Sequence, residues 1–315
     1  RNQAQLFEVP SASDFPREAP REDLAAANAI RDAALAEKRE LLTESEAKAL
    51  LGAFGLPVPL TRVARDAQAA VKAAGELGYP VALKVHSRDI THKTDVGGVR
   101  LDLHDEAMVR TAFEQIVRSL KAARPDARFD GVAVQPMLRF AFHREVLAGV
   151  YTDPVFGPVI SFGAGGVAVE AMRDSAVALP PLNVALARDL MERTRMWRLL
   201  QAYRDVPAAD LQALAELLCG VSRMVCALPW LKEMDLNPVL AHPGGAVIAD
   251  ARVLIDPARR VAPPRYGHMA IHPYPSELEG EIALRDGRRV RVRPIRPEDA
   301  ERELRFFAGL SARSR

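Results

Sequence analysis

The chain has 315 residues, of which 49% are hydrophobic and 27% are charged, and its formal net charge is +2. This length and composition predict a globular protein with two or three lobes. The small net charge and the dispersed Lys and Arg residues argue against nucleic-acid binding, and the sequence contains no apolar run of about 18 residues that could cross a membrane. We therefore expect a cytoplasmic protein, with Cys219 and Cys226 as buried thiols on one helix.

The first 42 residues are predicted to form a connector followed by one helix. Residues 1–20 contain three prolines and no regular period, whereas residues 21–38 are rich in alanine, which favours a helix. Thr43-Glu44-Ser45-Glu46 then has the spacing of a capping box. It predicts a helix that ends at Gly55.

A lysine and a glycine pair mark the next region. A predicted helix over 66–77 is followed by a strand, Val81–Val85, whose apolar residues alternate so that Lys84 lies on the opposite face. A second strand over 99–103 follows Gly97-Gly98. This order differs from a Walker loop, which leads from a strand into a helix. It predicts a glycine hairpin whose backbone N–H groups close over phosphates beside Lys84, and the alternative is a lysine on an exposed strand face.

A change of pattern near residue 130 predicts a small lobe over 43–130 and a larger, sheet-based lobe over 131–262. The larger lobe is predicted to contain strands 131–137, 144–151 and 158–162, helices 184–203 and 208–227, and strands 231–240 and 246–255. Gly163–Gly166 follows a strand, but another strand is predicted from Val167 onward. This glycine cluster is therefore not a dinucleotide-binding fingerprint.

The last two strands carry a second polar motif, Glu233-Met234-Asp235-Leu236-Asn237-Pro238. Asp235 and Asn237 are two residues apart, so a strand directs both to one face, and a hairpin partner brings Asp250 beside them. Two carboxylates and an amide oxygen suit magnesium, which prefers oxygen ligands. The alternative is that Asp235 and Asn237 are polar residues at a turn before Pro238.

The stretch Thr91-His92-Lys93-Thr94-Asp95-Val96-Gly97-Gly98-Val99 resembles the nucleotide-binding half of the NDP-forming acyl-CoA synthetases, the ADP-forming acetate–CoA ligase type. That family is related to the succinyl-CoA synthetase β subunit and has an ATP-grasp fold, in which two α+β lobes hold a nucleotide between them. Its loop histidine becomes a phosphohistidine that carries phosphate to or from the nucleotide. The resemblance covers roughly residues 43–256, rests on four separated motifs, and places this role on His92.

The resemblance also implies roles for other residues. ATP or ADP with Mg²⁺ would be bound by these nucleotide-contacting residues: Lys84, Lys93, Gly97, Gly98, Val134, Gln135, Met137 and Glu145. The implied metal ligands are Asp235, Asn237 and Asp250, and the implied catalytic residues are His92, Asp174 and Asp235, with Asp174 as a carboxylate close to the docked histidine. Two features depart from the family pattern: Ser87-Arg88-Asp89 replaces the usual Ser-Pro-Asp, and the Gly163–Gly166 loop differs slightly.

The C-terminal part has a different pattern. A proline-rich linker is predicted over 263–279, and residues 281–285 and 289–293 flank Asp286-Gly287, which is a hairpin signal. A helix is predicted to start within Arg296–Ala300. Residues 280–315 resemble the first strands and helix of a GNAT acetyltransferase domain, an arrangement found in bacterial protein lysine acetyltransferases that also contain an acyl-CoA-synthetase-like region.

We therefore expect this chain to be the central piece of such a protein. CoA-binding or CoA-ligase domains, which would bind CoA or acyl-CoA, are expected upstream, and the rest of a GNAT domain downstream. The expected partners are these domains and protein lysine substrates, within an oligomer. Two functions remain open: an active ADP-forming acyl-CoA synthetase component, or a regulatory module that binds nucleotide or responds to CoA without turnover. In the second case His92 would be a loop histidine without phosphate chemistry.

Overall fold

The computed structural model describes residues 23–90, 92–166, 174–259, 266–272, 274, 275 and 278–311. Its described residues up to Ala270 belong to one compact unit, and those from Ile271 onward belong to another. The first unit contains α2 (Leu24–Ala36), α3 (Glu44–Ala53), β1 (Arg62–Ala64), α4 (Ala67–Leu77), β2 (Val81–His86), β3 (Val99–Leu103), α5 (Glu106–Ala123), β4 (Gly131–Pro136), β5 (Arg144–Asp153), β6 (Gly157–Ala164), β7 (Ser175–Ala178), α7 (Val184–Glu192), α8 (Met196–Leu200), α9 (Leu211–Ala227), β8 (Leu231–His242), β9 (Gly245–Ile248) and β10 (Ala251–Ile255).

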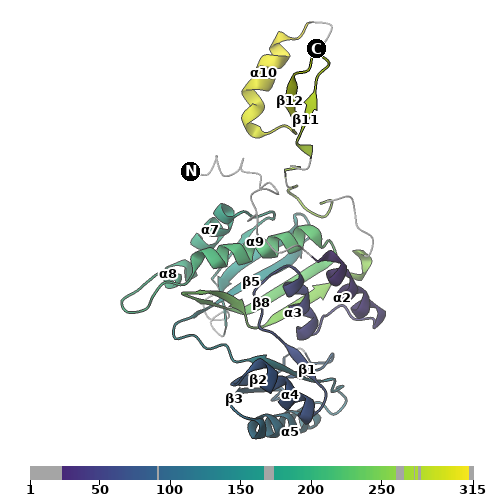
Figure 1. Cartoon of the computed structure of the whole chain (residues 1–315), viewed down its shortest axis with the longest axis vertical. Coiled ribbons are helices and arrows are strands. Elements are labelled where there is room, and N and C mark those ends of the chain that lie inside the picture. The colour runs from purple at the N-terminus through teal and green to yellow at the C-terminus, as the bar shows by residue number, and fades with distance from the viewer. Residues whose placement is uncertain are drawn as a thin grey trace. The chain divides into compact units, whose positions relative to one another are not determined.

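The smaller sheet has four antiparallel strands in the order β1-β4-β2-β3, and α4 and α5 pack against it (Figure 1). The predicted alternation in β2 is confirmed, because Val81, Leu83 and Val85 are buried in the core that these two helices share with the sheet. Lys84 lies between them in the sequence and leaves the strand on the other face. The smaller sheet therefore presents this lysine away from its own hydrophobic core.

The larger sheet has six strands, with β10-β8-β5-β6-β7 side by side and β9 paired to β8. Helix α9 lies along this sheet (Figure 1), and the core combines residues of α2, α3, α7 and α9 with those of the strands. On the sheet's opposite face, Asp235 of β8 pairs with Gly149 of β5 and Arg252 of β10. Polar side chains thus remain on the face that the helical layer does not cover.

The predicted boundary at residue 130 needs correction on both sides. Strand β4 pairs with β1 and β2, so it belongs to the smaller sheet and not to the larger lobe. Helix α3, predicted in the smaller lobe, instead buries Leu50 and Leu51 in the core of the larger sheet. Strand pairing and helix docking are long-range contacts, which neither local period nor capping specifies.

Two long predicted elements are also interrupted. The strand predicted over 246–255 is divided into β9 and β10, and Ala249-Asp250 lies at the break. There the Ala249 N–H donates to the Pro238 carbonyl at 3.0 Å. The helix predicted over 184–203 is divided into α7 and α8. The strand predicted from Val167 lies outside the described residues.

The second unit contains β11 (Gly280–Ala283), β12 (Arg289–Val292), a 3-10 turn (Pro297–Asp299) and α10 (Ala300–Gly309). The two strands pair antiparallel, and Gly287 in their turn has a φ of 85°, a conformation that favours glycine. The predicted hairpin and helix are confirmed. Among the helices of the described ranges, none has the length and apolar character needed to cross a membrane.

We predict that Leu50→Ala lowers the free energy of unfolding by about 2–5 kcal/mol, because the side chain is fully buried where α3 joins the larger sheet. Denaturant unfolding of the whole chain measures this change. Leu60→Ala is the matched control, since Leu60 is 65% exposed and should cost less than about 0.5 kcal/mol. Equal losses would contradict the placement of α3 in this core.

Candidate functional site

The first turn of α3 begins the site. The predicted capping box is present: the Glu46 N–H donates to Thr43 Oγ1 at 3.3 Å, and the Thr43 N–H donates to Glu46 Oε2 at 2.7 Å. These bonds fix the start of the helix, so that Glu44 is its first residue. Its side chain is only 2% exposed and points to the smaller sheet instead of to solvent.

Three lysines from separate segments surround the Glu44 carboxylate. Oε1 accepts from Lys48 Nζ at 2.7 Å and from Lys84 Nζ at 2.9 Å, and Oε2 forms an ion pair with Lys93 Nζ at 2.9 Å. Lys48 is on α3, Lys84 on β2, and Lys93 in the loop between β2 and β3. The predicted residues Lys84 and Lys93 are therefore brought together on Glu44, and Glu44 and Lys48, which the sequence did not predict, belong to α3 itself.

Lys48 joins the helix to both sheets. Its side chain is 2% exposed, and besides Glu44 it donates to Gln135 Oε1 of β4 at 3.0 Å and to the Ala249 carbonyl beside β10 at 2.9 Å. Gln135 Nε2 in turn donates to Glu44 Oε1 at 3.0 Å. The predicted nucleotide-side residue Gln135 is thus part of the same cluster.

Asp250 faces the same lysines from the larger sheet. Its Oδ1 is buried without a hydrogen-bond partner among the described residues, 3.8 Å from Lys84 Nζ and 3.9 Å from Lys93 Nζ. The side chain as a whole is 44% exposed. The carboxylate therefore has one oxygen in the lysine cluster and remains open to solvent on its other side.

The lysines and carboxylates of the cluster shift one another's pKa values. Burial favours the neutral form of Glu44, but Lys84, Lys48 and Lys93 outweigh it and hold the pKa of this carboxyl far below its usual range. Burial lowers the pKa of Lys48 to about 8, although Glu44 partly offsets it. Burial also opposes the charge of Lys93, yet Glu44 and Asp250 raise its pKa. With three ammonium groups and two carboxylates charged, the cluster carries one net positive charge.

Two of the predicted metal ligands, Asp235 and Asn237, lie in the middle of β8, and the third, Asp250, lies directly before β10. Asp235 pairs with Arg252, so in the same register Asn237 lies across from Asp250, and paired residues share a face of the sheet. Burial raises the pKa of Asp235, the positive charge of Arg252 opposes this, and the negative charge of Asp250 adds to it. Asn237 Oδ1 already accepts the Gly166 N–H at 2.7 Å.

The glycine hairpin closes tightly beside Lys84. Gly97 has a φ of 60°, and the Gly98 N–H donates to the Lys93 carbonyl at 2.8 Å. A Cβ on Gly98 would lie 2.4 Å from Val85 Cγ1, so a larger residue there would displace the strand or the loop. His92 is exposed in this loop, next to Lys93. The histidine thus precedes a lysine of the cluster in the chain and is exposed.

The remaining predicted residues do not contact the lysines in the described contacts. Both Asp174 oxygens accept backbone N–H groups at the start of α8, from Arg195 at 2.8 Å and Met196 at 2.7 Å, so this carboxylate caps a helix. Glu145 lies against Gly166 near Asn237. Val134 is buried in β4, and the Met137 N–H donates to the Pro80 carbonyl.

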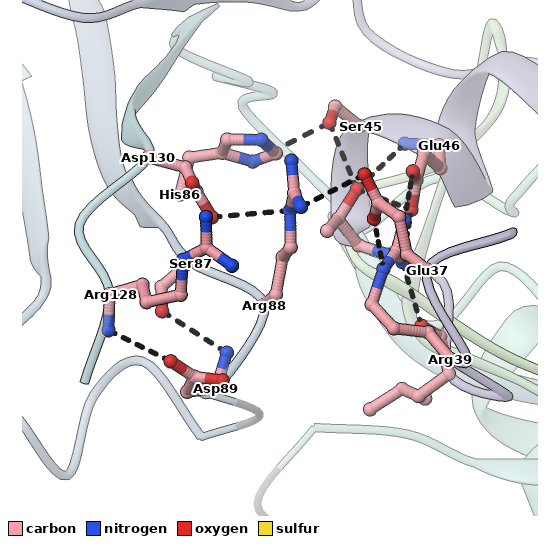
Figure 2. Close-up of polar contacts among 12 residues, drawn as sticks. Glu37, Arg39, Ser45, Glu46, His86, Ser87, Arg88, Asp89, Arg128 and Asp130 are labelled. Atoms are coloured by element: carbon pink, nitrogen blue, oxygen red, sulfur yellow. Dashed lines mark hydrogen bonds and ion pairs between the residues drawn. The ribbon is translucent and has the colours of Figure 1, made fainter. Parts of the chain in front are cut away.

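A second polar network holds the start of the loop between β2 and β3, and Figure 2 shows Arg88 at the centre of this network. Arg88 Nη1 lies 2.9 Å from Glu37 Oε1, just after α2, and Nε lies 3.4 Å from Asp130 Oδ2. Ser45 Oγ lies 3.5 Å from His86 Nδ1. The residue that departs from the family pattern therefore connects the loop to the α2–α3 segment.

The network extends along that segment through Arg39. This guanidinium donates to Glu37 Oε2 at 2.7 Å and to both Glu46 oxygens at 2.9 and 2.7 Å (Figure 2). Glu44, Ser45 and Glu46 thus point to three different groups. One turn of helix aligns the lysines, contacts the end of β2 and anchors the Arg39 network.

Comparison with known proteins identifies the family. A family model for the ATP-grasp domain matches residues 33–255. The chain is 37% identical over 232 residues to the β subunit of acetate–CoA ligase (ADP-forming) I of Pyrococcus furiosus. This alignment covers 74% of the present chain and 99% of that subunit. The chain therefore belongs to the ATP-grasp family, as the ATP-grasp part of a protein like the ADP-forming acetyl-CoA synthetases, which are ligases.

Solved structures agree with this assignment. Dinucleotide-forming acetyl-coenzyme A synthetase 1 of Candidatus Korarchaeum cryptofilum, in complex with coenzyme A, Ca-AMPCP and HgCl⁺, matches with a TM-score of 0.71 and 34% identity over 73% of this chain and 100% of that one. A second structure of that enzyme, with coenzyme A and Mg-AMPPCP and with its phosphohistidine segment pointing towards the nucleotide-binding site, matches with a TM-score of 0.65 and 32% identity over the same shares. The predicted ATP-grasp fold is confirmed.

We predict that Arg88→Ala increases amide hydrogen exchange in the loop after β2 by about two- to fivefold, because partly exposed ion pairs contribute up to about 1 kcal/mol. Exchange measured by mass spectrometry on peptides covering residues 86–98 tests this. Arg139→Ala, which removes a surface ion pair with Asp102 elsewhere in the same lobe, should leave the loop unchanged. Unchanged exchange in the Arg88 variant would show that this arginine does not restrain the loop.

Proposed function

We propose that this chain binds a magnesium nucleotide between its two sheets and passes a phosphoryl group between the nucleotide and His92. The observation that supports it best is the convergence of Lys84, Lys93 and Lys48 between the sheets, with one net positive charge. Phosphate oxygens are strong acceptors for ammonium groups. A nucleotide polyphosphate at this place would contact Lys84 and Lys93, with Gly97 and Gly98 above it.

The proposed metal ligands are Asp235, Asn237 and Asp250. The buried Asp250 Oδ1 without a hydrogen-bond partner among the described residues, and the strand register that puts Asp250 across from Asn237, fit a bound cation. Magnesium prefers such oxygen donors and would neutralise phosphate charge when bound. The chain's own contribution is to hold these oxygens on one face of the larger sheet, opposite the lysines.

The proposed reaction is a phosphoryl transfer. A neutral imidazole nitrogen of His92 attacks the terminal phosphorus of ATP, an N–P bond forms, and the bond between this phosphorus and its bridging oxygen breaks with its electron pair on ADP. In the reverse direction ADP takes the phosphoryl group and His92 regains its lone pair. The exposed position of His92 next to Lys93 suits a group that exchanges between two sites. The phosphohistidine segment of the Korarchaeum enzyme, which points towards its nucleotide site, supports this role.

Asp174 is proposed as the carboxylate near the docked histidine. In the described structure it caps α8, so it would have to accept from the histidine in addition to these backbone groups. We further propose CoA-ligase domains upstream, which bind CoA or acyl-CoA, and a GNAT domain that starts with β11, β12 and α10. The confirmed hairpin and helix support the latter.

We predict that Lys84→Ala weakens MgADP binding about tenfold or more, because a charge-assisted contact of about 1.5–3 kcal/mol is lost. Isothermal titration calorimetry of the chain with MgADP measures the affinity. Lys72→Ala is the control, since Lys72 is an exposed lysine on α4 of the same lobe. If the wild type does not bind MgADP, or if both variants bind it with equal affinity, the nucleotide does not bind at this site.

We also predict that Asp250→Asn weakens binding of MgADP more than binding of metal-free ADP, because the substitution removes a metal ligand. Calorimetry with and without magnesium gives the ratio of variant to wild-type affinity for each form of the nucleotide. Asp256→Asn serves as the control, because this carboxylate contacts Arg259 after the end of β10. Equal losses for the two forms of the nucleotide would argue against the metal assignment.

Phosphorylation of His92 is tested with ATP labelled on its terminal phosphate. We expect acid-labile, base-stable label on the wild-type chain and none on His92→Ala. His104→Ala, which replaces another exposed histidine, should retain the label. Label that persists in the His92 variant contradicts the transfer, and a chain that binds ATP tightly without any label favours the regulatory function.

A further inference from the structure

We propose that Glu44 is the positioning residue of the phosphate site: its buried carboxylate holds the ammonium groups of Lys84 and Lys93 in place for the nucleotide, while Lys48 fixes that carboxylate. This inference rests on the proposed nucleotide site and adds to it two residues, Glu44 and Lys48, with different tasks. Neither residue is expected to be the main contact of the phosphates.

The hydrogen bonds of the three lysines indicate that Lys48 has a different role from Lys84 and Lys93. An ammonium group has three hydrogens. Lys48 uses all three, on Glu44, Gln135 and the Ala249 carbonyl, at 2.7, 3.0 and 2.9 Å. In the described residues Lys84 donates to two acceptors, Glu44 and the Ala249 carbonyl, and Lys93 contacts Glu44. Lys84 and Lys93 therefore retain hydrogens for a ligand, whereas Lys48 does not.

Glu44 is suited to position these groups because its own place is fixed. It is the first residue of α3, whose capping box holds the helix start and whose residues Leu50 and Leu51 are buried in the core of the larger sheet. Lys84 leaves a strand of the smaller sheet, and Lys93 belongs to the loop that carries His92. One rigid carboxylate therefore fixes the positions of two long side chains from the other lobe. A lysine that was not held in this way would lose more side-chain entropy on binding phosphate.

Two other roles for Glu44 make different predictions. If it only stabilised the fold, its loss would weaken nucleotide binding equally whether or not Lys84 is present. If it competed with phosphate for the lysines, its removal would tighten binding. A positioning residue instead acts through the lysines, so its effect should shrink when Lys84 is absent, because neighbouring groups in one network are not additive.

The experiment is a double-mutant cycle on MgADP affinity with four chains: wild type, Glu44→Gln, Lys84→Ala and the double variant. We expect Glu44→Gln to weaken binding about tenfold in the wild type, comparable to the loss of one charge-assisted contact, and less than about threefold in the Lys84→Ala background. Equal weakening in both backgrounds, or tighter binding by Glu44→Gln, overturns the proposal. Failure of the wild type to bind would instead refute the proposed function.

Glu44→Asp provides a second test if Glu44→Gln does not fold. Aspartate keeps the charge but withdraws the carboxylate by one methylene, so it cannot contact the lysines as glutamate does. We expect the aspartate variant, checked for folding by thermal unfolding, to bind MgADP at least about threefold more weakly than the wild type. Unchanged affinity in a folded Glu44→Asp chain would contradict positioning by this side chain.

Discussion

The site depends on one buried carboxylate shared by three ammonium groups. Removing such charges from water costs several kcal/mol per ion, and a buried ion pair seldom adds net stability over apolar packing. The proposed phosphate binding therefore accounts for the cluster better than a contribution to stability does. Its single positive charge, between Lys84 on one sheet and Asp250 on the other, matches the negative charge of a magnesium nucleotide.

The position of α3 makes this arrangement possible. The helix packs in the core of the larger sheet, yet its first turn reaches the smaller sheet and the histidine-carrying loop. Glu44 contacts the lysines, Ser45 lies next to His86, and Glu46 holds Arg39. Because Arg88 links the same region to Glu37 and Asp130, the same segment holds both the start of the loop and the proposed phosphate site. Movement of the loop would have to preserve or break these contacts.

The sequence predicted those parts of the site that have a local pattern. Lys84 on an alternating strand, the close-packed Gly98 and the capping box at Thr43 each follow from period or spacing. Glu44 and Lys48 were missed because their separation of four residues also describes an ordinary exposed ion pair on a helix. Their burial depends on β4 and on the break at Ala249-Asp250, which are tertiary features. The same reason explains why β4 was assigned to the wrong lobe, and why the capping of α8 by Asp174 was not foreseen.

The central claim is that the lysine cluster between the sheets receives the phosphates. A crystal structure of the chain with MgADP tests it most directly. We expect phosphate oxygens within hydrogen-bond distance of Lys84 and Lys93, and magnesium beside Asp235, Asn237 and Asp250. Lys48 should still be bonded to Glu44 and Gln135. A nucleotide bound elsewhere, with all three lysines still on Glu44, would contradict it.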